Sequence, residues 1–222
     1  MSEKKLILLG AGDLSREIMI AATEPHELAA GVKYETIAFI DDDPMKIGTK
    51  CEGISVISFV DVKQWLDEDV YFISGLGFPG DRKSMVNKLL DVVPNAKFAN
   101  VIHRSAVIIP NAKIEKGVYI GLNATIAIGC LIKSHTVLNF NVSIGHDCII
   151  NQYSVVSPGC LLSGFTEVGE ETFLGSGVIT YPGVRIGKKC AVSAGVVMAR
   201  NLADAKKMIL KPNTMIIPVE NP

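Results

Sequence analysis

Residues 114–132, IEKGVYIGLNATIAIGCLI, repeat one pattern every six residues. Counting in steps of six from Ile102 to Met198 gives seventeen positions without an insertion or deletion, and all of them except Thr180 are aliphatic. The series is Ile102, Ile108, Ile114, Ile120, Ile126, Ile132, Leu138, Ile144, Ile150, Val156, Leu162, Val168, Leu174, Thr180, Ile186, Val192 and Met198. Moving the frame by one residue leaves a single aliphatic residue, Ile109, so the period does not arise from an apolar composition.

Two further series share this six-residue spacing. A small residue stands four positions after each aliphatic one, as at Ala106, Cys130 and Val178. The positions just before these small residues are rich in glycine, asparagine, histidine and aspartate, which tolerate turns and a positive φ. We therefore expect short strands that alternate with tight corners.

A unit of six residues is too short to form a helix with its own caps, so each unit must stack on copies of itself. Such hexapeptides resemble the left-handed parallel β-helix, in which three units make one triangular coil and residues 18 apart lie above one another. With stacked strands about 4.8 Å apart, the repeat gives a prism roughly 27 Å long. The aliphatic series fills the axis of this prism, and the small series fits where the wall approaches the corners.

The composition limits the classes of function. The chain of 222 residues has a net charge of −1, and its basic residues do not cluster, so nothing indicates a nucleic-acid surface or a polybasic membrane patch. No apolar run reaches the roughly 18 residues of a membrane-spanning helix, and we expect a cytoplasmic protein. Four of the five cysteines, Cys130, Cys148, Cys160 and Cys190, belong to the small series and are expected to act as small interior side chains.

The residues before the repeat alternate between predicted strands and helices. We expect strands at 5–9, 36–40 and 70–74, and helices at 13–22 and 81–90. This alternation predicts a small parallel sheet of the doubly wound type. The predicted fold class is therefore α/β plus β.

The domain division follows from the start of the repeat. Residues 1–98 are expected to form a Rossmann-like, nucleotide-sugar-binding domain, and residues 99–222 a left-handed β-helix domain with a C-terminal tail. Ligands of open parallel sheets bind beyond the carboxyl ends of the strands. The candidate substrate-binding residues at these ends are Gly10, Gly12, Asp13, Asp41, Asp42 and Gly75.

The residue types at these strand ends suit a nucleotide. Glycines let a phosphate approach the backbone amides, and a carboxylate can accept hydrogen bonds from a ribose or a base. The first turn lacks the third glycine of the G-x-G-x-x-G pattern, which favours a mononucleotide or a nucleotide sugar over a dinucleotide. In the alternative interpretation the glycines only form turns and the aspartates are a solvated strand end.

The histidines are the candidate proton acceptors near neutral pH. His26 is expected at the surface, His103 lies at the junction of the two domains, and His135 falls in the corner series, where a turn role explains it. His146 belongs to neither the aliphatic nor the corner series. We expect it at a flat wall position with its ring projecting outward, followed by Asp147.

This organisation resembles the family of sialic-acid O-acetyltransferases and bacterial nucleotide-amino-sugar N-acetyltransferases. The residues that carry the resemblance are Gly10-Ala11-Gly12 in the first turn, Phe39-Ile40-Asp41-Asp42 after the second strand, Asn139, and Gly145-His146-Asp147 in the coils. The resemblance implies acetyl-CoA as the acyl donor, no metal, and a homotrimer. It also implies His146 as the general base, with Asn139 and Asp147 in the same site, and contacts to acetyl-CoA from Gly164, Ser176 and Ala194.

Two residues depart from the family pattern. Members commonly have a second histidine nine residues after the base, where this chain has Val155, and many have a histidine in the first glycine turn, where it has Leu14. Neither change removes the base. Both leave the identity of the acceptor open.

The resemblance implies a specific chemistry that the residues can perform. A sugar amine or hydroxyl that attacks a thioester must lose a proton, and a positioned imidazole that takes it contributes about 10²- to 10⁴-fold. Backbone N–H groups can hold the developing oxyanion. The predicted activity is acetyl transfer from acetyl-CoA to a nucleotide-linked amino sugar, and a sugar O-acetyltransferase of the sialic-acid type is the near alternative.

Two other classes use the same kind of prism. A zinc enzyme resembling γ-class carbonic anhydrase needs three converging histidines, two of them five residues apart, whereas His135 and His146 are eleven apart. A non-catalytic trimeric scaffold that binds a nucleotide sugar is the third alternative, and Val155 and Leu14 favour it.

Overall fold

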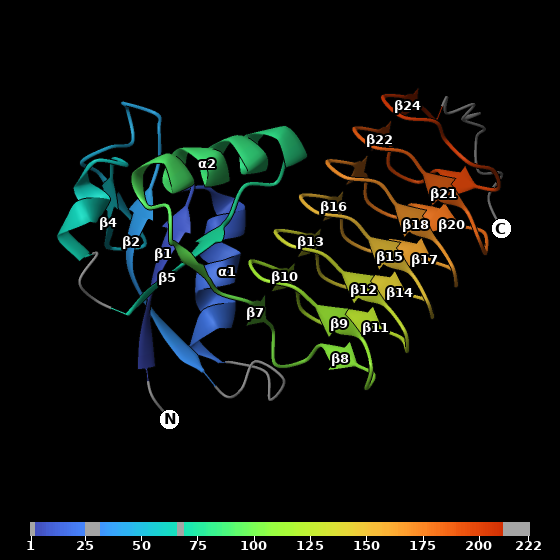
Figure 1. Ribbon diagram of the computed structural model, residues 1–222, viewed down its shortest axis with the longest axis horizontal. Helices are drawn as coiled ribbons and strands as arrows, with labels where there is room; N and C mark the ends of the chain where they lie inside the picture. The colour runs from blue at the N-terminus through green and yellow to red at the C-terminus, as the bar shows by residue number, and fades with distance from the viewer. Residues whose placement is uncertain (1–2, 25–31, 66–68, 211–222) are drawn as a thin grey trace, which may run out of the picture.

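The computed structural model describes residues 3–24, 32–65 and 69–210. His26 and the C-terminal residues from 211 onward lie outside the described residues. Two bodies are visible in Figure 1, an N-terminal domain of sheet and helices and a prism of stacked coils. The predicted fold class, α/β plus a parallel β-helix, is confirmed.

The N-terminal domain is built around a sheet with the strand order β3-β4-β2-β1-β5-β6. Its elements are β1 (Glu3–Leu9), α1 (Asp13–Thr23), β2 (Lys33–Ile40), β3 (Lys50–Cys51), β4 (Ile54–Ile57), the 3₁₀ helix η2 (Asp61–Trp65), β5 (Val70–Ser74), α2 (Pro79–Val92) and β6 (Lys97–Phe98). All of its strand pairs are parallel except β3 with β4. The three predicted strands and two predicted helices are present, and α2 begins at a proline that suits the first helical turn.

The prism has three faces, each a parallel sheet of two-residue strands. Face 1 contains β7 (Val101–Ile102), β10 (Tyr119–Ile120), β13 (Val137–Leu138), β16 (Val155–Val156), β19 (Phe173–Leu174), β22 (Ala191–Val192) and β24 (Lys207–Met208). Face 2 contains β8 (Val107–Ile108), β11 (Thr125–Ile126), β14 (Ser143–Ile144), β17 (Leu161–Leu162), β20 (Ile179–Thr180) and β23 (Val197–Met198). Face 3 contains β9 (Lys113–Ile114), β12 (Leu131–Ile132), β15 (Ile149–Ile150), β18 (Glu167–Val168) and β21 (Arg185–Ile186).

Residues 18 apart pair directly, as the six-residue period predicts. Tyr119 lies opposite Val137 on face 1, and Ser143 lies opposite Leu161 on face 2. The aliphatic series packs inside the prism as one continuous core. Thr180, its exception, is also buried, with 1% of its surface exposed.

The corners between faces contain the residues with positive φ. We name them by the faces they join, so that the chain passes the 1–2, 2–3 and 3–1 corners in turn. Asn141 (φ 57°) lies in a 1–2 corner, Asp147 (φ 57°) in a 2–3 corner and His135 (φ 60°) in a 3–1 corner. The corner series of the sequence therefore marks the positions where the backbone turns in the left-handed region.

The N-terminal domain packs against face 1. Leu8 of β1 and Ile18 of α1 share an apolar cluster with the outward side chains of Tyr119, Val137 and Val155. Near the top of this interface in Figure 1, α2 lies close to the upper coils. Here Lys83 pairs with Glu170 at 2.9 Å, and the rings of Phe78 and Phe173 stack with their centroids 5.6 Å apart.

Candidate active site

His146 lies in the 2–3 corner between β14 and β15, so the expectation of a flat wall position was wrong. The reason is that Gly145, His146 and Asp147 together make the turn, and Asp147 takes the positive φ. The corner nevertheless projects the imidazole outward, and about half of the side chain (52%) is exposed.

Asp147 orients the imidazole of His146. Its Oδ2 lies 2.9 Å from His146 Nδ1. Because an ionised carboxylate only accepts hydrogen bonds, this contact places the proton on Nδ1 and leaves Nε2 as the ring's acceptor. The pair can thus receive a proton at Nε2.

The next coil holds the other side of the ring. Phe165 meets the imidazole edge-on, with centroids 4.9 Å apart and an interplanar angle of 87°. A Cβ added to Gly164 would lie 2.5 Å from His146 Nε2, so only glycine leaves room for the ring. At the coil before, a side chain on Gly129 would overlap the Asp147 carboxylate.

The other predicted site residues of the prism do not lie beside His146 in the same chain. Asn139, Ser176 and Ala194 belong to 1–2 corners, whereas His146 and Gly164 belong to 2–3 corners. The two sets are therefore separated by the width of face 2. Asn139 uses its Oδ1 locally, accepting a hydrogen bond from the N–H of Phe140 at 2.8 Å.

The carboxyl ends of the N-terminal strands form a cleft of about 290 Å³. It is lined by Asp41, Asp42, Asp43, Lys46, Leu76, Asp81, Ser84 and Met85. Asp42 is half exposed and pairs with Lys88 at 2.5 Å. The cleft therefore presents carboxylates and a lysine at the place where parallel sheets bind ligands.

Asp41 connects the segments around this cleft through hydrogen bonds. Its carboxylate accepts hydrogen bonds from the N–H groups of Ala11 (2.8 Å) and Asp43 (3.0 Å), and Lys46 Nζ lies 3.1 Å away. Burial raises the pKa of Asp41, but these backbone hydrogen bonds and the lysine outweigh burial, so the pKa lies below its usual value. Asp41 is thus ionised at neutral pH and fixes the first glycine turn to the end of β2.

The glycines at the strand ends serve close packing. Gly10 has a φ of +93°, and its carbonyl accepts a 2.5 Å hydrogen bond from Ser15 Oγ. A side chain on Gly75 would overlap Ser15. Gly12 is the N-cap of α1 and Asp13 its first residue, which extends into solvent and pairs with Arg16 at 3.2 Å.

The two positions that lack the family histidines both belong to the interface between the domains. Val155 is 3% exposed and lies in the apolar cluster between β1, α1 and face 1. Leu14 is partly buried and packs against the same cluster. Both replacements therefore add an apolar side chain to this interface.

The remaining described histidines do not approach His146. His103 lies in a 1–2 corner and His135 in a 3–1 corner, so the three occupy different corners of the prism. Among the described residues, no group of three His, Cys, Asp or Glu side chains could hold a metal ion. In one chain, the three histidines of a zinc enzyme are not brought together.

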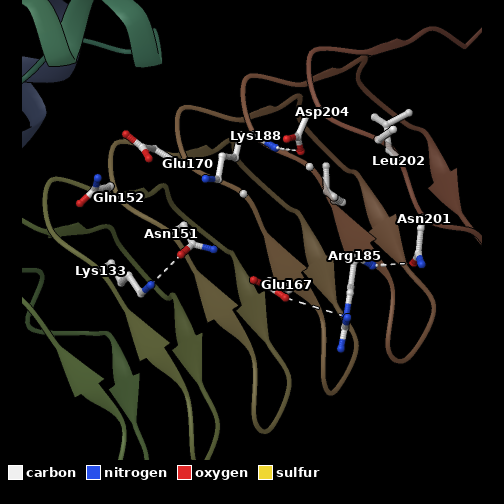
Figure 2. A pocket seen from close by; sticks show the side chains of 14 residues that line it. Lys133, Asn151, Gln152, Glu167, Glu170, Arg185, Lys188, Asn201, Leu202 and Asp204 are labelled. Atoms are coloured by element: carbon white, nitrogen blue, oxygen red, sulfur yellow. Dashed lines mark hydrogen bonds and ion pairs between the residues drawn. The ribbon is translucent and has the colours of Figure 1, made fainter.

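A groove of about 730 Å³ runs along face 3, and none of the predicted site residues lines it. Figure 2 shows that some of its polar groups bond to one another. Lys133 contacts Asn151 at 2.8 Å, and Arg185 lies 3.9 Å from Glu167. No histidine is among the described residues that line this groove, so the candidate site stays at the His146 corner.

Three family models match parts of the chain. Residues 5–89 match the PglD N-terminal domain, residues 97–181 the GMPPB C-terminal domain, and residues 166–200 the hexapeptide repeat of succinyl-transferase. No curated protein sequence matches the chain.

Several solved structures are similar over nearly the whole chain. The acetyltransferase domain of PglB from Neisseria gonorrhoeae, in complex with acetyl coenzyme A, has 24% identity and a TM-score of 0.79, and the match covers 93% of this chain and 96% of that one. PerB from Caulobacter crescentus, in complex with CoA and GDP-perosamine, has 24% identity and a TM-score of 0.79, with coverage of 91% and 92%. This chain has the PglB and PerB fold.

WeeI from Acinetobacter baumannii shares this fold at 19% identity, with a TM-score of 0.79 and coverage of 93% and 96%. The resemblance inferred from the sequence is thus confirmed in fold and domain order. The acyltransferase class predicted from the sequence is the class of the PglB and PerB structures, and their bound molecules, acetyl-CoA or CoA, match the predicted donor. Within the described residues, no helix is long and apolar enough to span a membrane.

Sequence reasoning missed Phe165 and Gly129 as neighbours of the His146–Asp147 pair. Phe165 occupies the corner series with a φ of 60°, a position that elsewhere holds mainly glycine, asparagine, histidine or aspartate. A bulky side chain in the left-handed region is unusual. The bulky residue at this corner position is therefore the sequence signal that could have identified Phe165.

Proposed function

We propose that the protein transfers the acetyl group of acetyl-CoA to the amine of a nucleotide-linked amino sugar, with His146 as the general base. The observation that carries this proposal is the outward imidazole whose Nδ1 is bonded to Asp147, which leaves Nε2 as the acceptor. A related protein, the perosamine N-acetyltransferase of C. crescentus, was solved with CoA and GDP-perosamine in a form with asparagine in place of a histidine.

The chemical roles follow from the geometry of the pair. The sugar amine attacks the thioester carbonyl and gives its proton to His146 Nε2, while Asp147 stabilises the imidazolium through Nδ1. The carbon–sulfur bond then breaks, and the CoA thiolate takes the proton back from Nε2. The products are the acetamido sugar and CoA.

The two domains have different roles, since one binds the nucleotide and the other carries out acyl transfer. Residues 1–98 bind the nucleotide in the cleft beside Asp41 and Asp42. Gly10, Gly12, Asp13 and Gly75 belong to the turns at the neighbouring strand ends. Residues 99–222 form the acyltransfer domain. The cytoplasmic location stays a prediction.

The site is incomplete in one chain, which favours a trimer. The N-terminal domain covers face 1, whereas His146 lies in the 2–3 corner, across the prism from that face. A sugar held in the cleft of one chain therefore reaches the imidazole of a neighbouring chain and not its own.

Face 2 is the surface that suits this association. It and its two corners carry most of the exposed apolar side chains of the prism, namely Val107, Ile109, Leu122, Ile128, Phe140, Leu161, Phe165, Ile179, Tyr181 and Val197. Face 3 carries charged outward residues such as Glu167 and Arg185. Exposed apolar side chains gathered on one side of the prism in this way favour an interaction site.

Association through face 2 completes the site. It brings the 1–2 corner of one chain, with Asn139, Ser176 and Ala194, toward the 2–3 corner of the next, with His146 and Gly164. Acetyl-CoA then binds between the two corners. The predicted site residues, divided between two edges of one face, thus meet in the trimer.

The direct test is an acetyl-transfer assay with acetyl-CoA and a panel of nucleotide-linked amino sugars, each paired with its hydroxyl counterpart. We expect acetylation of an amine, and a loss of roughly 10²- to 10⁴-fold in kcat in His146→Gln. The matched control is His103→Gln, because the His103 ring bonds to the nearby Ser105 and lies in a different corner.

Two results would overturn the proposal. Full activity in His146→Gln would show that His146 is not the general base. Acetylation of the hydroxyl sugars alone would show that the protein is an O-acetyltransferase. Mass spectrometry of the product distinguishes the amide from the ester.

A further inference from the structure

One hydrogen bond departs from the pattern that the described 2–3 corners share, in the coil next to His146. In the 2–3 corners, the first corner residue donates its N–H to a backbone carbonyl of the next coil. The bonds are Ile109 to Ile126 (2.9 Å), Ala127 to Ile144 (2.9 Å), Gly145 to Leu162 (2.7 Å) and Tyr181 to Met198 (2.9 Å). Ser163 instead donates to the side-chain Oγ1 of Thr180, at 3.0 Å.

The hydroxyl of Thr180 belongs to a closed ring of hydrogen bonds. Thr166 Oγ1 lies 2.8 Å from Thr180 Oγ1 and 2.7 Å from the carbonyl of Ser163. A hydroxyl has one proton, and that of Thr166 goes to the carbonyl, so Thr180 donates to Thr166 and accepts from Ser163. Both hydroxyls are then satisfied within the apolar core.

This ring of hydrogen bonds links the two ends of the 2–3 corner in the next coil, which contacts the imidazole of His146. Ser163 begins this corner and Thr166 follows it, and between them lie Gly164 and Phe165. These are the two residues that face the ring of His146. The ring of hydrogen bonds acts from inside the prism, and the imidazole lies outside it.

The position of Thr180 makes this arrangement specific. It is the one polar member of the aliphatic series, where a hydroxyl costs free energy unless it is hydrogen-bonded. A valine has nearly the same shape and would suit the core better. The hydroxyl therefore contributes to the corner and not to the packing.

We propose that Thr180 is a positioning residue for His146, setting the corner at Gly164 and Phe165 so that the imidazole keeps its orientation toward Asp147. This inference rests on the proposed function only for its effect on catalysis. Its effect on the ring can be measured without any substrate.

The test compares Thr180→Val with Thr172→Val. Thr172 is also buried, donates to the Gly187 carbonyl at 2.7 Å and accepts from the Cys190 N–H at 3.0 Å, but it lies beyond a 3–1 corner, away from His146. Each variant is labelled with 13Cε1-histidine, and the signal of His146 is assigned with His146→Gln. Its chemical shift is followed from pH 5 to pH 8, and kcat and KM are measured with acetyl-CoA.

We expect Thr180→Val to move the His146 signal and its titration curve, and to lower kcat about tenfold with KM within about twofold, since small displacements of a catalytic group are costly. Thr172→Val is expected to leave the signal and kcat unchanged. An unchanged His146 signal in Thr180→Val, or the same change in both variants, would overturn the proposal. If the wild type acetylates no acceptor, the proposed function fails while the spectra still decide the role of Thr180.

Discussion

At the scale of residues, the imidazole of His146 is held between an acidic neighbour and a glycine. Asp147 bonds to Nδ1, and Gly164 leaves just enough space beside Nε2. The site therefore requires that residue 164 has no side chain, in addition to requiring the side chains of His146 and Asp147.

Gly164→Ala tests this dependence. The added methyl would lie 2.5 Å from Nε2, so the ring must move, and we expect kcat to fall by roughly 100-fold. Gly80→Ala is the control, because a Cβ there meets nothing within 4 Å. Steady-state kinetics with acetyl-CoA, together with thermal melts that check folding, give the answer; equal activity in the two variants would contradict the expectation.

His135 provides a second residue-scale prediction, on pH and stability. Burial, then Arg82 and Lys116, lower the pKa of His135 to about 4, with Glu115 acting weakly in the other direction. Because this folded-state pKa lies below the unfolded value, the unfolded chain binds more protons between these values. The contribution of neutral His135 to the free energy of unfolding is therefore present above about pH 6.5. It falls by about 2 kcal/mol on going from pH 7 to pH 5.

The variant His135→Asn isolates this contribution. Asparagine tolerates the positive φ of the corner but does not titrate, and it loses the ring contacts with Tyr153 and Phe98. We expect lower stability at pH 7 and a weaker dependence on pH in urea denaturation between pH 5 and pH 7. An identical dependence in both proteins would assign the acid sensitivity to other groups.

At the scale of elements, the six-residue period predicts the prism because each two-residue strand contributes one inward side chain. The same period does not show which faces are covered. Face 1 is packed against β1 and α1 and face 2 is open, and this difference depends on how the N-terminal domain docks. Both faces carry apolar outward residues, Tyr119 and Val137 on face 1 and Leu161 and Ile179 on face 2, so the sequence does not tell them apart.

Leu161→Glu tests the proposed role of face 2. Leu161 points outward on β17 and is 46% exposed, so a carboxylate there would be buried in an interface. We expect a monomer of 23.8 kDa by light scattering, where the wild type has about three times that mass. Ile149→Glu on face 3 is the matched control and should leave the assembly intact; a trimer in both variants would place the interface elsewhere.

The candidate site was predictable to the extent that it lies within one corner. His146 and Asp147 are adjacent in sequence, and the resemblance identified both. Phe165 and Gly129 contact them only because coils stack at 18-residue spacing, and the sequence does not state which of the stacked side chains turn toward the ring. Thr180 was visible as an exception in the aliphatic series, but its hydrogen bonds required coordinates.

At the scale of the whole molecule, the cleft beside Asp41 and the imidazole of His146 belong to opposite sides of one chain. The sheet that forms the cleft is fixed on face 1, through the apolar cluster and the pairing of Lys83 with Glu170. No bending within one chain brings the cleft to the 2–3 corner without breaking these contacts. The proposed reaction is thus a property of the assembly.

Because the cleft and the imidazole lie on opposite sides of the prism, a variant that damages one and a variant that damages the other complement each other in a genetic sense. A chain with an inactive imidazole still offers an intact cleft to its neighbour, and a chain with a damaged cleft still offers a working base. Mixed assemblies of two inactive variants would then contain some complete sites, each built from one good half of two different chains. Two variants that are each inactive alone would therefore regain part of the activity when their chains assemble together.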